Sequence, residues 1–354
     1  MLKKRDEYVE ALCHELSART DYLDRHEEVK TIYFGGGTPS QLTISHVGQI
    51  LHAVRENYAV SPDAEITFEA NPSDISRDYA DGLRALGINR VSLGIQSFQD
   101  SLLRFIGRRH DALVAMDAVR TLQGAGFSNI SIDLIFGLPG QTMKQWNDDL
   151  TTTLSLGIQH ISAYSLMYEE GTRLYQMLTE NMIEETDEEL SIEMYKLLIH
   201  RLQLAGYRHY EISNFALPDC HSRHNSSYWD GTHYLGVGAA AHSFDGSSRQ
   251  WNVSDIDAYI SGIESGNHQA EVERLTDTQR LNEMIMTRLR TAEGLNLAAV
   301  EANYGCKVRN HILTNATPYI ICNKLKHDKQ TDIISLTPDG ILTSNDIIAS
   351  LFMV

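Results

Sequence analysis

The chain has 354 residues, enough for one large α/β domain and a smaller one, and its 42% hydrophobic and 22% charged residues are ordinary for a soluble globular protein. Its formal net charge of −17 argues against nucleic-acid binding and against docking on anionic lipid without a partner, since both need a basic surface. No apolar run approaches the roughly 20 residues of a membrane helix, and no apolar core follows the basic start, so we expect a cytoplasmic protein without a signal peptide.

The first predicted element is a helix from about Lys3 to Leu23, with Tyr8, Leu12 and Leu16 on one stripe. No strand precedes this helix. Because a helix follows a strand in a series of βα units, either the fold opens with a helix or its first strand is missing from this chain.

Short apolar strands then alternate with helical segments through the first half of the chain. The segments between the strands carry apolar residues at a spacing of three or four, which is typical of amphipathic helices. Such alternation indicates parallel βαβ units, and at least five of them without a Rossmann fingerprint predict a full or partial (β/α) barrel. The predicted strands are Thr31–Phe34, Ala64–Phe68, Arg90–Ile95, Asn129–Phe136 and His160–Met167.

After residue 185 the pattern changes. We expect a long helix at Leu190–Leu204, a strand at Tyr207–Phe215, and then a segment rich in histidine and aromatic residues that ends at Phe244. From about Thr276 two helices and a β-hairpin with its turn at Pro338–Gly340 indicate a small winged-helix-like domain. On an acidic chain such a domain is expected to be a packing or lid element. The predicted domains are a partial barrel core (1–185), a barrel extension (186–270) and the C-terminal α+β domain (271–354).

Polar and glycine residues follow the predicted strands where a barrel would bring them to one mouth. Singly, each has an ordinary role, as a turn glycine or as an acid that caps a neighbouring helix. Together they offer a guanidinium for a carboxylate, carboxylates for a ribose diol or an ammonium, and an amide, a set that suits a nucleoside joined to an amino acid. These residues are Gly35, Gly36, Gly37, Thr38, Glu69, Gln96, Arg108 and Asp133.

The four cysteines, Cys13, Cys220, Cys306 and Cys322, are widely separated. They form neither a CxxC nor a CxxxCxxC spacing, so no contiguous metal-binding loop can be recognised. We expect reduced thiols and no metal site formed by this chain.

The segments GGGTPS, EANP, SLGIQSF, IGRRH, IDLIFGLPGQT and RHNSSYWxxxxYLGVGAAAHS together resemble the radical S-adenosylmethionine (SAM) family of oxygen-independent coproporphyrinogen III dehydrogenases and HemW-type haem chaperones. The resemblance covers nearly the whole chain. It implies that Gly36, Gly37 and Thr38 hold the methionine part of SAM, that Arg108 meets its carboxylate and that Asp133 lies on the ribose side. Glu69 and Gln96 would complete this cofactor site. In the family, a [4Fe–4S] cluster reduces SAM to a radical that abstracts hydrogen.

The family holds its cluster with a CxxxCxxC loop after the first barrel strand, and neither is present here. We therefore expect the coding sequence to continue upstream of Met1 through that strand and loop, so that the cluster belongs to a full-length form. The chain as given should not assemble the cluster, and whether the protein is an enzyme stays open.

His224, Asn225, Tyr228 and Trp229 form an HNxxYW pattern that resembles the haem-chaperone branch of the family. Imidazole is a common haem ligand, and an aromatic pair can cover a porphyrin face. The other reading is that these residues hold a loop and fill the side of the barrel, in which case Cys220, His221 and His242 are competing ligands.

Haem binding and transfer to an unidentified acceptor protein is the favoured function. Two alternatives stay open. One is the oxygen-independent coproporphyrinogen III oxidase reaction, a SAM-dependent oxidative decarboxylation in porphyrin biosynthesis. The other is a barrel that binds SAM without using it.

Overall fold

The structure, a computed structural model, describes residues 2–24 and 26–353 of the chain. These residues pack as two compact units that each combine distant segments. Unit 1 consists of Met1–Thr31, Ser45–Ala64 and Arg223–Val354, and unit 2 of Ile32–Ile44 and Glu65–Ser222. The division into 1–185, 186–270 and 271–354 stays a prediction.

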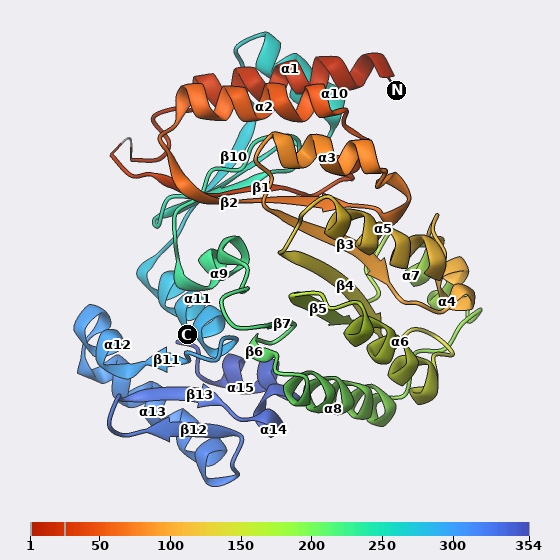
Figure 1. The fold of residues 1–354 in the computed structure, drawn as a ribbon. Coiled ribbons are helices and arrows are strands. Elements are labelled where there is room, and N and C mark those ends of the chain that lie inside the picture. The colour runs from red at the N-terminus through yellow and green to blue at the C-terminus, as the bar shows by residue number, and fades with distance from the viewer. Residues whose placement is uncertain (1, 25, 354) are drawn as a thin grey trace. The chain divides into compact units, whose positions relative to one another are not determined.

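A curled, mostly parallel sheet, whose larger part belongs to unit 2, confirms the partial barrel (Figure 1). Its strands lie in the order β1-β2-β3-β4-β5-β7-β6. Neighbouring strands from β2 to β5 are parallel, and the last two strands run antiparallel. The strands are β1 (Val29–Phe34), β2 (Val60–Ala70), β3 (Arg90–Gln96), β4 (Ile130–Phe136), β5 (His160–Ser165), β6 (Arg208–Glu211) and β7 (Asn214–Ala216). The single strand expected over Tyr207–Phe215 was wrong, because the chain reverses after Glu211 and pairs with itself.

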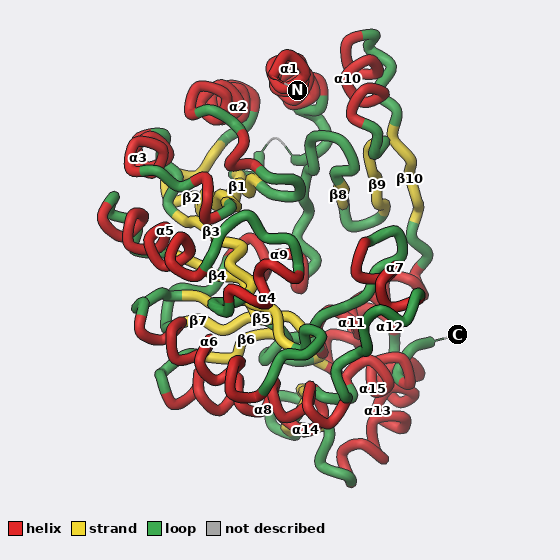
Figure 2. Tube along the Cα trace, turned by 90° about the vertical axis from the view of Figure 1, so that its right-hand side faces the viewer, coloured by secondary structure: helices red, strands yellow, loops and turns green. Residues whose placement is uncertain are grey.

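Helices cover one face of this sheet (Figure 2). They are α3 (Arg77–Ala85), α5 (Ala112–Gly124), α6 (Met143–Ser155) and α8 (Glu188–Leu204). The shorter helices α4 (Asp100–Phe105) and α7 (Arg173–Thr179) follow β3 and β5. Local capping sets the helix starts: Thr142 and Gln145 form a capping box at α6, and the Asp111 side chain caps α5.

The strands of unit 2 alternate between apolar and polar residues. On β3, Val91, Leu93 and Ile95 are fully buried, whereas Ser92 and Gln96 occupy the other face of the pleat. The rings of Phe68 on β2 and Tyr79 on α3 lie 6.3 Å apart, which shows that the apolar face is the one packed against helices. The opposite, inner face carries polar side chains on each of these strands, among them Glu69, Ser92, Asp133 and Ser162.

Unit 1 contains helices α1 (Leu2–Ala18), α2 (Ile44–Asn57), α9 (Arg223–Asp230) and α10 (Ile256–Glu264). It also contains the antiparallel sheet β10-β9-β8, formed by β8 (His242–Phe244), β9 (Ser248–Asn252) and β10 (Ala270–Arg274). The predicted first helix is confirmed, although it ends at Ala18 rather than near Leu23.

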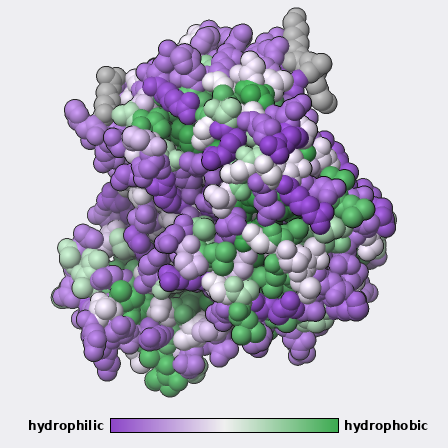
Figure 3. All heavy atoms as spheres, in the orientation of Figure 1, coloured by the Kyte–Doolittle hydropathy of each residue, from purple (hydrophilic) through white to green (hydrophobic). Residues whose placement is uncertain are grey.

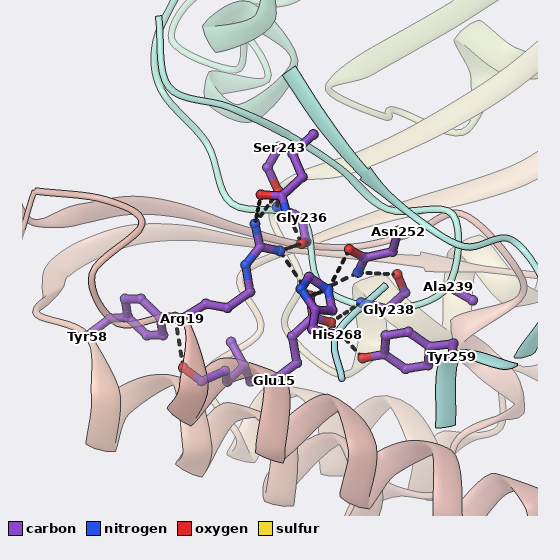
Figure 4. Close-up of polar contacts among 12 residues, drawn as sticks. Glu15, Arg19, Tyr58, Gly236, Gly238, Ala239, Ser243, Asn252, Tyr259 and His268 are labelled. Atoms are coloured by element: carbon purple, nitrogen blue, oxygen red, sulfur yellow. Dashed lines mark hydrogen bonds and ion pairs between the residues drawn. The ribbon is translucent and has the colours of Figure 1, made fainter. Parts of the chain in front are cut away.

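Glu15 on α1 is a buried centre of polar contacts in unit 1 (Figure 4). Its side chain is 1% exposed, and the two carboxylate oxygens accept hydrogen bonds from side chains and backbone of four other segments. The donors are Arg19 Nη1 (2.9 Å), Gly238 N (2.9 Å), Asn252 Nδ2 (2.9 Å) and Tyr259 OH (2.6 Å), and His268 Nε2 lies 3.2 Å away. These contacts hold α1 against the loop before β8, the sheet and α10.

The C-terminal part of unit 1 confirms the winged-helix-like domain. Four helices and a three-stranded sheet of order β11-β13-β12 enclose a core that includes Ile285, Ile312, Ile334 and Ile347. The hairpin predicted around Pro338–Gly340 was wrong: Thr337 caps a helix there with Pro338 in its first turn, and the hairpin joins β12 to β13. The elements are α11 (Asp277–Leu289), β11 (Leu295–Asn296), α12 (Leu297–Tyr304), α13 (Cys306–Ile321), β12 (Leu325–Asp328), β13 (Ile333–Leu336), α14 (Pro338–Ile341) and α15 (Ser344–Ser350).

The part of the chain that the structure describes contains no helix that is both long and apolar enough to cross a membrane. The face drawn in Figure 3 is mostly hydrophilic, and its hydrophobic residues lie in small, separate groups.

Candidate functional site

Two acids meet on the polar inner face of unit 2. Glu69 near the end of β2 accepts a hydrogen bond of 2.5 Å from the hydroxyl of Tyr33 on β1. Asp133 on β4 accepts one of 3.3 Å from Ser92, and Ser162 on β5 also donates to it. The register explains this meeting, because Ser162 lies opposite Asp133 and Ser92 lies opposite Glu69.

The negative charge of Glu69 affects the pKa of Asp133. Burial, and after it the negative charge of Glu69, raise the pKa of Asp133 from 3.8 to about 7. Burial and the same two acids raise the pKa of Tyr33, so its phenol stays a hydrogen-bond donor. Asp133 is therefore partly protonated near neutral pH, and the site is suited to a cationic or hydroxyl-rich ligand that would favour its ionised form.

The glycine segment after β1 presents bare backbone beside these acids. Gly35 has no room for a side chain, because a Cβ there would meet the Tyr33 ring and lie 2.9 Å from Glu69 Oε1. Gly36 has a φ of +91°, which a glycine adopts without strain, and a Cβ at Gly36 or Gly37 would meet nothing within 4 Å. Thr38 is exposed next to them. Open space over two glycines is what a ligand needs in order to approach the backbone closely.

Gln96 and Arg108 lie together at the end of β3. The register between β3 and β4 shifts after Gly94, and Gln96 has a φ of 72°, a conformation rare outside glycine. Arg108 Nη2 donates to the carbonyl of Gly94 over 2.6 Å, while its buried Nε lacks a hydrogen-bond partner in the described structure. Burial lowers the pKa of Arg108, and Asp133 acts against that shift. An unpaired N–H on a buried guanidinium fits the carboxylate of an amino-acid ligand.

The structure therefore brings Gly36, Gly37, Glu69, Arg108 and Asp133 to one end of one polar face, and their part in cofactor binding stays a prediction. Tyr33, Ser92 and Ser162, which hydrogen-bond to the acids, were not among the residues predicted from the sequence. The alternation of polar and apolar residues along the strands was the signal that could have identified them.

The described residues fit SAM but not an iron–sulfur cluster. Nowhere in residues 2–24 and 26–353 do three or more His, Cys, Asp or Glu side chains gather to hold a metal. Cys13 and Cys220 are half-buried single thiols, and Cys306 and Cys322 are exposed on the C-terminal domain. No step that depends on a cluster can be derived from these residues.

The HNxxYW residues lie on or beside helix α9 of unit 1. The Nδ1 atom of His224 is 2.9 Å from the hydroxyl of Thr31 on β1, and its Nε2 atom is 3.0 Å from the hydroxyl of Tyr228, one turn further along α9. Asn225 is half-buried, and the buried indole N–H of Trp229 finds no hydrogen-bond partner in the described structure. Tyr228 is 44% exposed, so the Nε2 side of His224 adjoins a side chain that partly faces solvent.

The competing candidates have different surroundings. Cys220 and His221 belong to unit 2, where burial raises the pKa of the thiol and the His221 ring stacks on Tyr210 at 4.2 Å. His242 is exposed on β8 and stacks on Trp251 at 5.8 Å. Both line a cavity of about 630 Å³ together with His268. No contact in the described structure orients His242 as Thr31 orients His224.

Comparison with known proteins identifies the family and the fold of this chain. A radical SAM superfamily profile matches residues 3–152, and the HemN C-terminal domain matches residues 275–343. The haem chaperone HemW of Lactococcus lactis is 33% identical over 342 residues, which are 97% of this chain and 88% of that protein. HemW of Bacillus subtilis is also 33% identical, over 97% of this chain and 90% of that protein.

A solved structure has the same fold. Coproporphyrinogen III oxidase (HemN) from Escherichia coli matches with a TM-score of 0.84 over 99% of this chain and 83% of that one. At 23% identity this likeness shows the fold alone. The identity to the HemW proteins, spread over nearly all of both sequences, shows that the chain belongs to the HemW family of radical SAM proteins.

Proposed function

We propose that this chain binds haem, with His224 as an iron ligand, and passes it to an acceptor protein. The observation that carries the proposal is the setting of His224, which has one ring nitrogen held by Thr31 and the other directed at the partly exposed Tyr228. An imidazole that is oriented by a partner at one ring nitrogen is the usual form of a protein ligand to iron, which binds at the other nitrogen. Haem is the cargo that the curated HemW relatives are named for.

We also propose that the inner face of unit 2 binds SAM. Arg108 would pair with its carboxylate, Glu69 and Asp133 would meet its ammonium and ribose, and the backbone of Gly36–Thr38 would lie along its methionine part. Gln96 completes the set. When bound, SAM supplies a sulfonium that a donor of one electron can cleave. The residues of this chain orient SAM and neutralise its charges.

No observation favours the coproporphyrinogen III oxidase reaction over haem transfer. The solved oxidase shares the fold, and the described residues offer no ligand set for the cluster that the reaction would use.

Haem titration followed by absorption spectroscopy tests the main proposal. We expect His224→Ala to lower haem affinity and to shift the Soret band, because it removes a ligand from the iron. His52→Ala is the matched control, since His52 is an exposed histidine on helix α2 of the same unit. Affinity and spectrum unchanged in His224→Ala would refute His224 as the ligand, and His242→Ala would be the next variant.

A further inference from the structure

The two hydroxyls beside His224 have different chemistry. A neutral imidazole has one N–H donor and one acceptor nitrogen, so one neighbouring hydroxyl accepts and the other donates. A phenol is more acidic than an aliphatic alcohol, which makes it the better donor and the poorer acceptor. The favoured arrangement has the His224 Nδ1–H donating to Thr31 Oγ1 and the Tyr228 hydroxyl donating to Nε2.

The placement of the two partners supports this division. Thr31 is half-buried on a strand and reaches His224 across 193 positions of the sequence, so the fold determines where its oxygen lies. Tyr228 lies one turn after His224 on α9, is 44% exposed, and its ring meets that of Tyr234 at 4.9 Å and 85°. The position of the Nδ1 partner is therefore set by tertiary structure, whereas the Nε2 partner belongs to the same helix as His224 and partly faces solvent.

Resting on the proposed function, we propose that Thr31 is a positioning residue for haem and Tyr228 a displaceable cap. Thr31 holds His224 as the Nδ1–H tautomer and so directs the Nε2 lone pair outward for iron. The Tyr228 hydroxyl occupies the place of the iron until haem arrives.

Simple geometry requires the displacement. An iron–imidazole bond is about 2 Å long, and the Tyr228 oxygen lies 3.0 Å from the same nitrogen, so both cannot remain there. Binding therefore breaks one hydrogen bond and forms one iron–nitrogen bond. The Tyr228 phenol keeps its proton, and its hydroxyl turns away from His224 towards the solvent.

The haem-free protein provides the first test. Histidine-selective ¹⁵N labelling, with His224→Ala to assign the signal, should show Nδ1 protonated and Nε2 unprotonated at neutral pH. Thr31→Val should shift the signal towards a mixture of tautomers, and Thr31→Ser should restore the wild-type signal. A predominantly Nε2-protonated His224 in the wild type would overturn the inference, whatever the haem measurements show.

Haem titration provides the second test. Thr31→Val, which keeps the β-branched shape on a strand, should weaken haem binding about tenfold, as loss of a ligand's outer partner does. Thr31→Ser should bind like the wild type. Tyr228→Phe should strengthen binding on the order of fivefold, because the competing hydrogen bond is gone.

The outcomes separate this inference from the proposed function. If His224→Ala loses haem while Thr31→Val and Tyr228→Phe both match the wild type, the ligand stands and the inference fails. If His224→Ala binds haem normally, the proposed ligand is wrong. If Tyr228→Phe weakens binding, Tyr228 supports haem and is not a cap.

Discussion

The Glu15 cluster of unit 1 and the Glu69–Asp133 pair of unit 2 both place carboxylates among polar side chains, yet their surroundings differ in kind. Glu15 has a cation, a histidine, a phenol, an amide and a backbone N–H around its two oxygens (Figure 4). Asp133 has two serine hydroxyls and a second acid, and no cation donates to it in the described structure. The donors to Glu15 include a cation, whereas the described donors to Asp133 are neutral hydroxyls.

The difference shows how a buried charge can serve structure or binding. A carboxylate whose oxygens already accept hydrogen bonds from several donors has no capacity left for a ligand. Glu15 therefore has a structural role and holds α1 against the β10-β9-β8 sheet. An acid whose pKa is raised to about 7 is unfavourably placed until a cationic or hydroxyl-rich ligand arrives. Substitutions should therefore have opposite effects on stability at the two sites.

The largest effect is expected on stability, from substitution of Glu15. Glu15→Gln replaces an acceptor oxygen by an NH₂ group among five donors and removes the negative charge that pairs with Arg19. We expect the free energy of unfolding to fall by about 3 kcal/mol, measured by urea denaturation. Glu10→Gln, an exposed residue on the same helix, is the control. A Glu15→Gln protein as stable as this control would show that Glu15 does not hold α1 against the sheet.

Asp133→Asn should have the opposite sign. The pKa of Asp133 rises from 3.8 to about 7 on folding, so the folded state holds a proton that the unfolded state has released, and wild-type stability falls as pH rises between these values. Asp133→Asn has no acid to ionise at this position, so its stability should not fall in this way. The variant should be more stable than the wild type by about 2 kcal/mol at pH 8. Urea denaturation from pH 4 to 8 measures it, with the exposed Asp117→Asn as control. Parallel pH profiles for variant and wild type would contradict the raised pKa.

The pH dependence of SAM binding sharpens the comparison. SAM carries positive charge and should favour ionised Asp133, so its affinity should fall about tenfold from pH 8 to pH 6, across the pKa of about 7. Calorimetric titration of the wild type and of Asp133→Asn measures this directly. The variant should bind weakly with little pH dependence. Equal wild-type affinity at pH 6 and pH 8 would remove Asp133 from the site.

The smallest effect is expected at Tyr33. Tyr33→Phe removes the hydroxyl that donates a hydrogen bond of 2.5 Å to Glu69 and leaves the ring in place. SAM affinity should fall about fivefold, since Glu69 loses its orienting partner. Tyr175→Phe, whose hydroxyl lies 3.4 Å from Glu170 at the surface, is the control. If both variants bind SAM equally well, the Tyr33 hydroxyl does not position Glu69.

Local sequence patterns determined much of this protein. The order of strands and helices up to β5, the glycine segment after β1 and the acids on β2 and β4 could all be read from periodicity and turn residues, because these depend on neighbours within a few positions. The prediction failed where a short sequence pattern is compatible with two different structures. Thr-Pro-Asp-Gly at residues 337–340 can form a turn or begin a helix, and packing of the C-terminal domain selected the helix.

Only the tertiary structure decided which polar groups meet. Nothing near Glu15 in the sequence predicts Gly238, Asn252 and Tyr259 as its donors, and nothing near His224 predicts Thr31. Likewise, the raised pKa of Asp133 depends on burial and on Glu69, which is 64 positions away by residue number (133 − 69). Periodicity identifies the face on which a side chain lies, whereas hydrogen bonds and charge interactions act over a few ångströms between segments that only folding brings together.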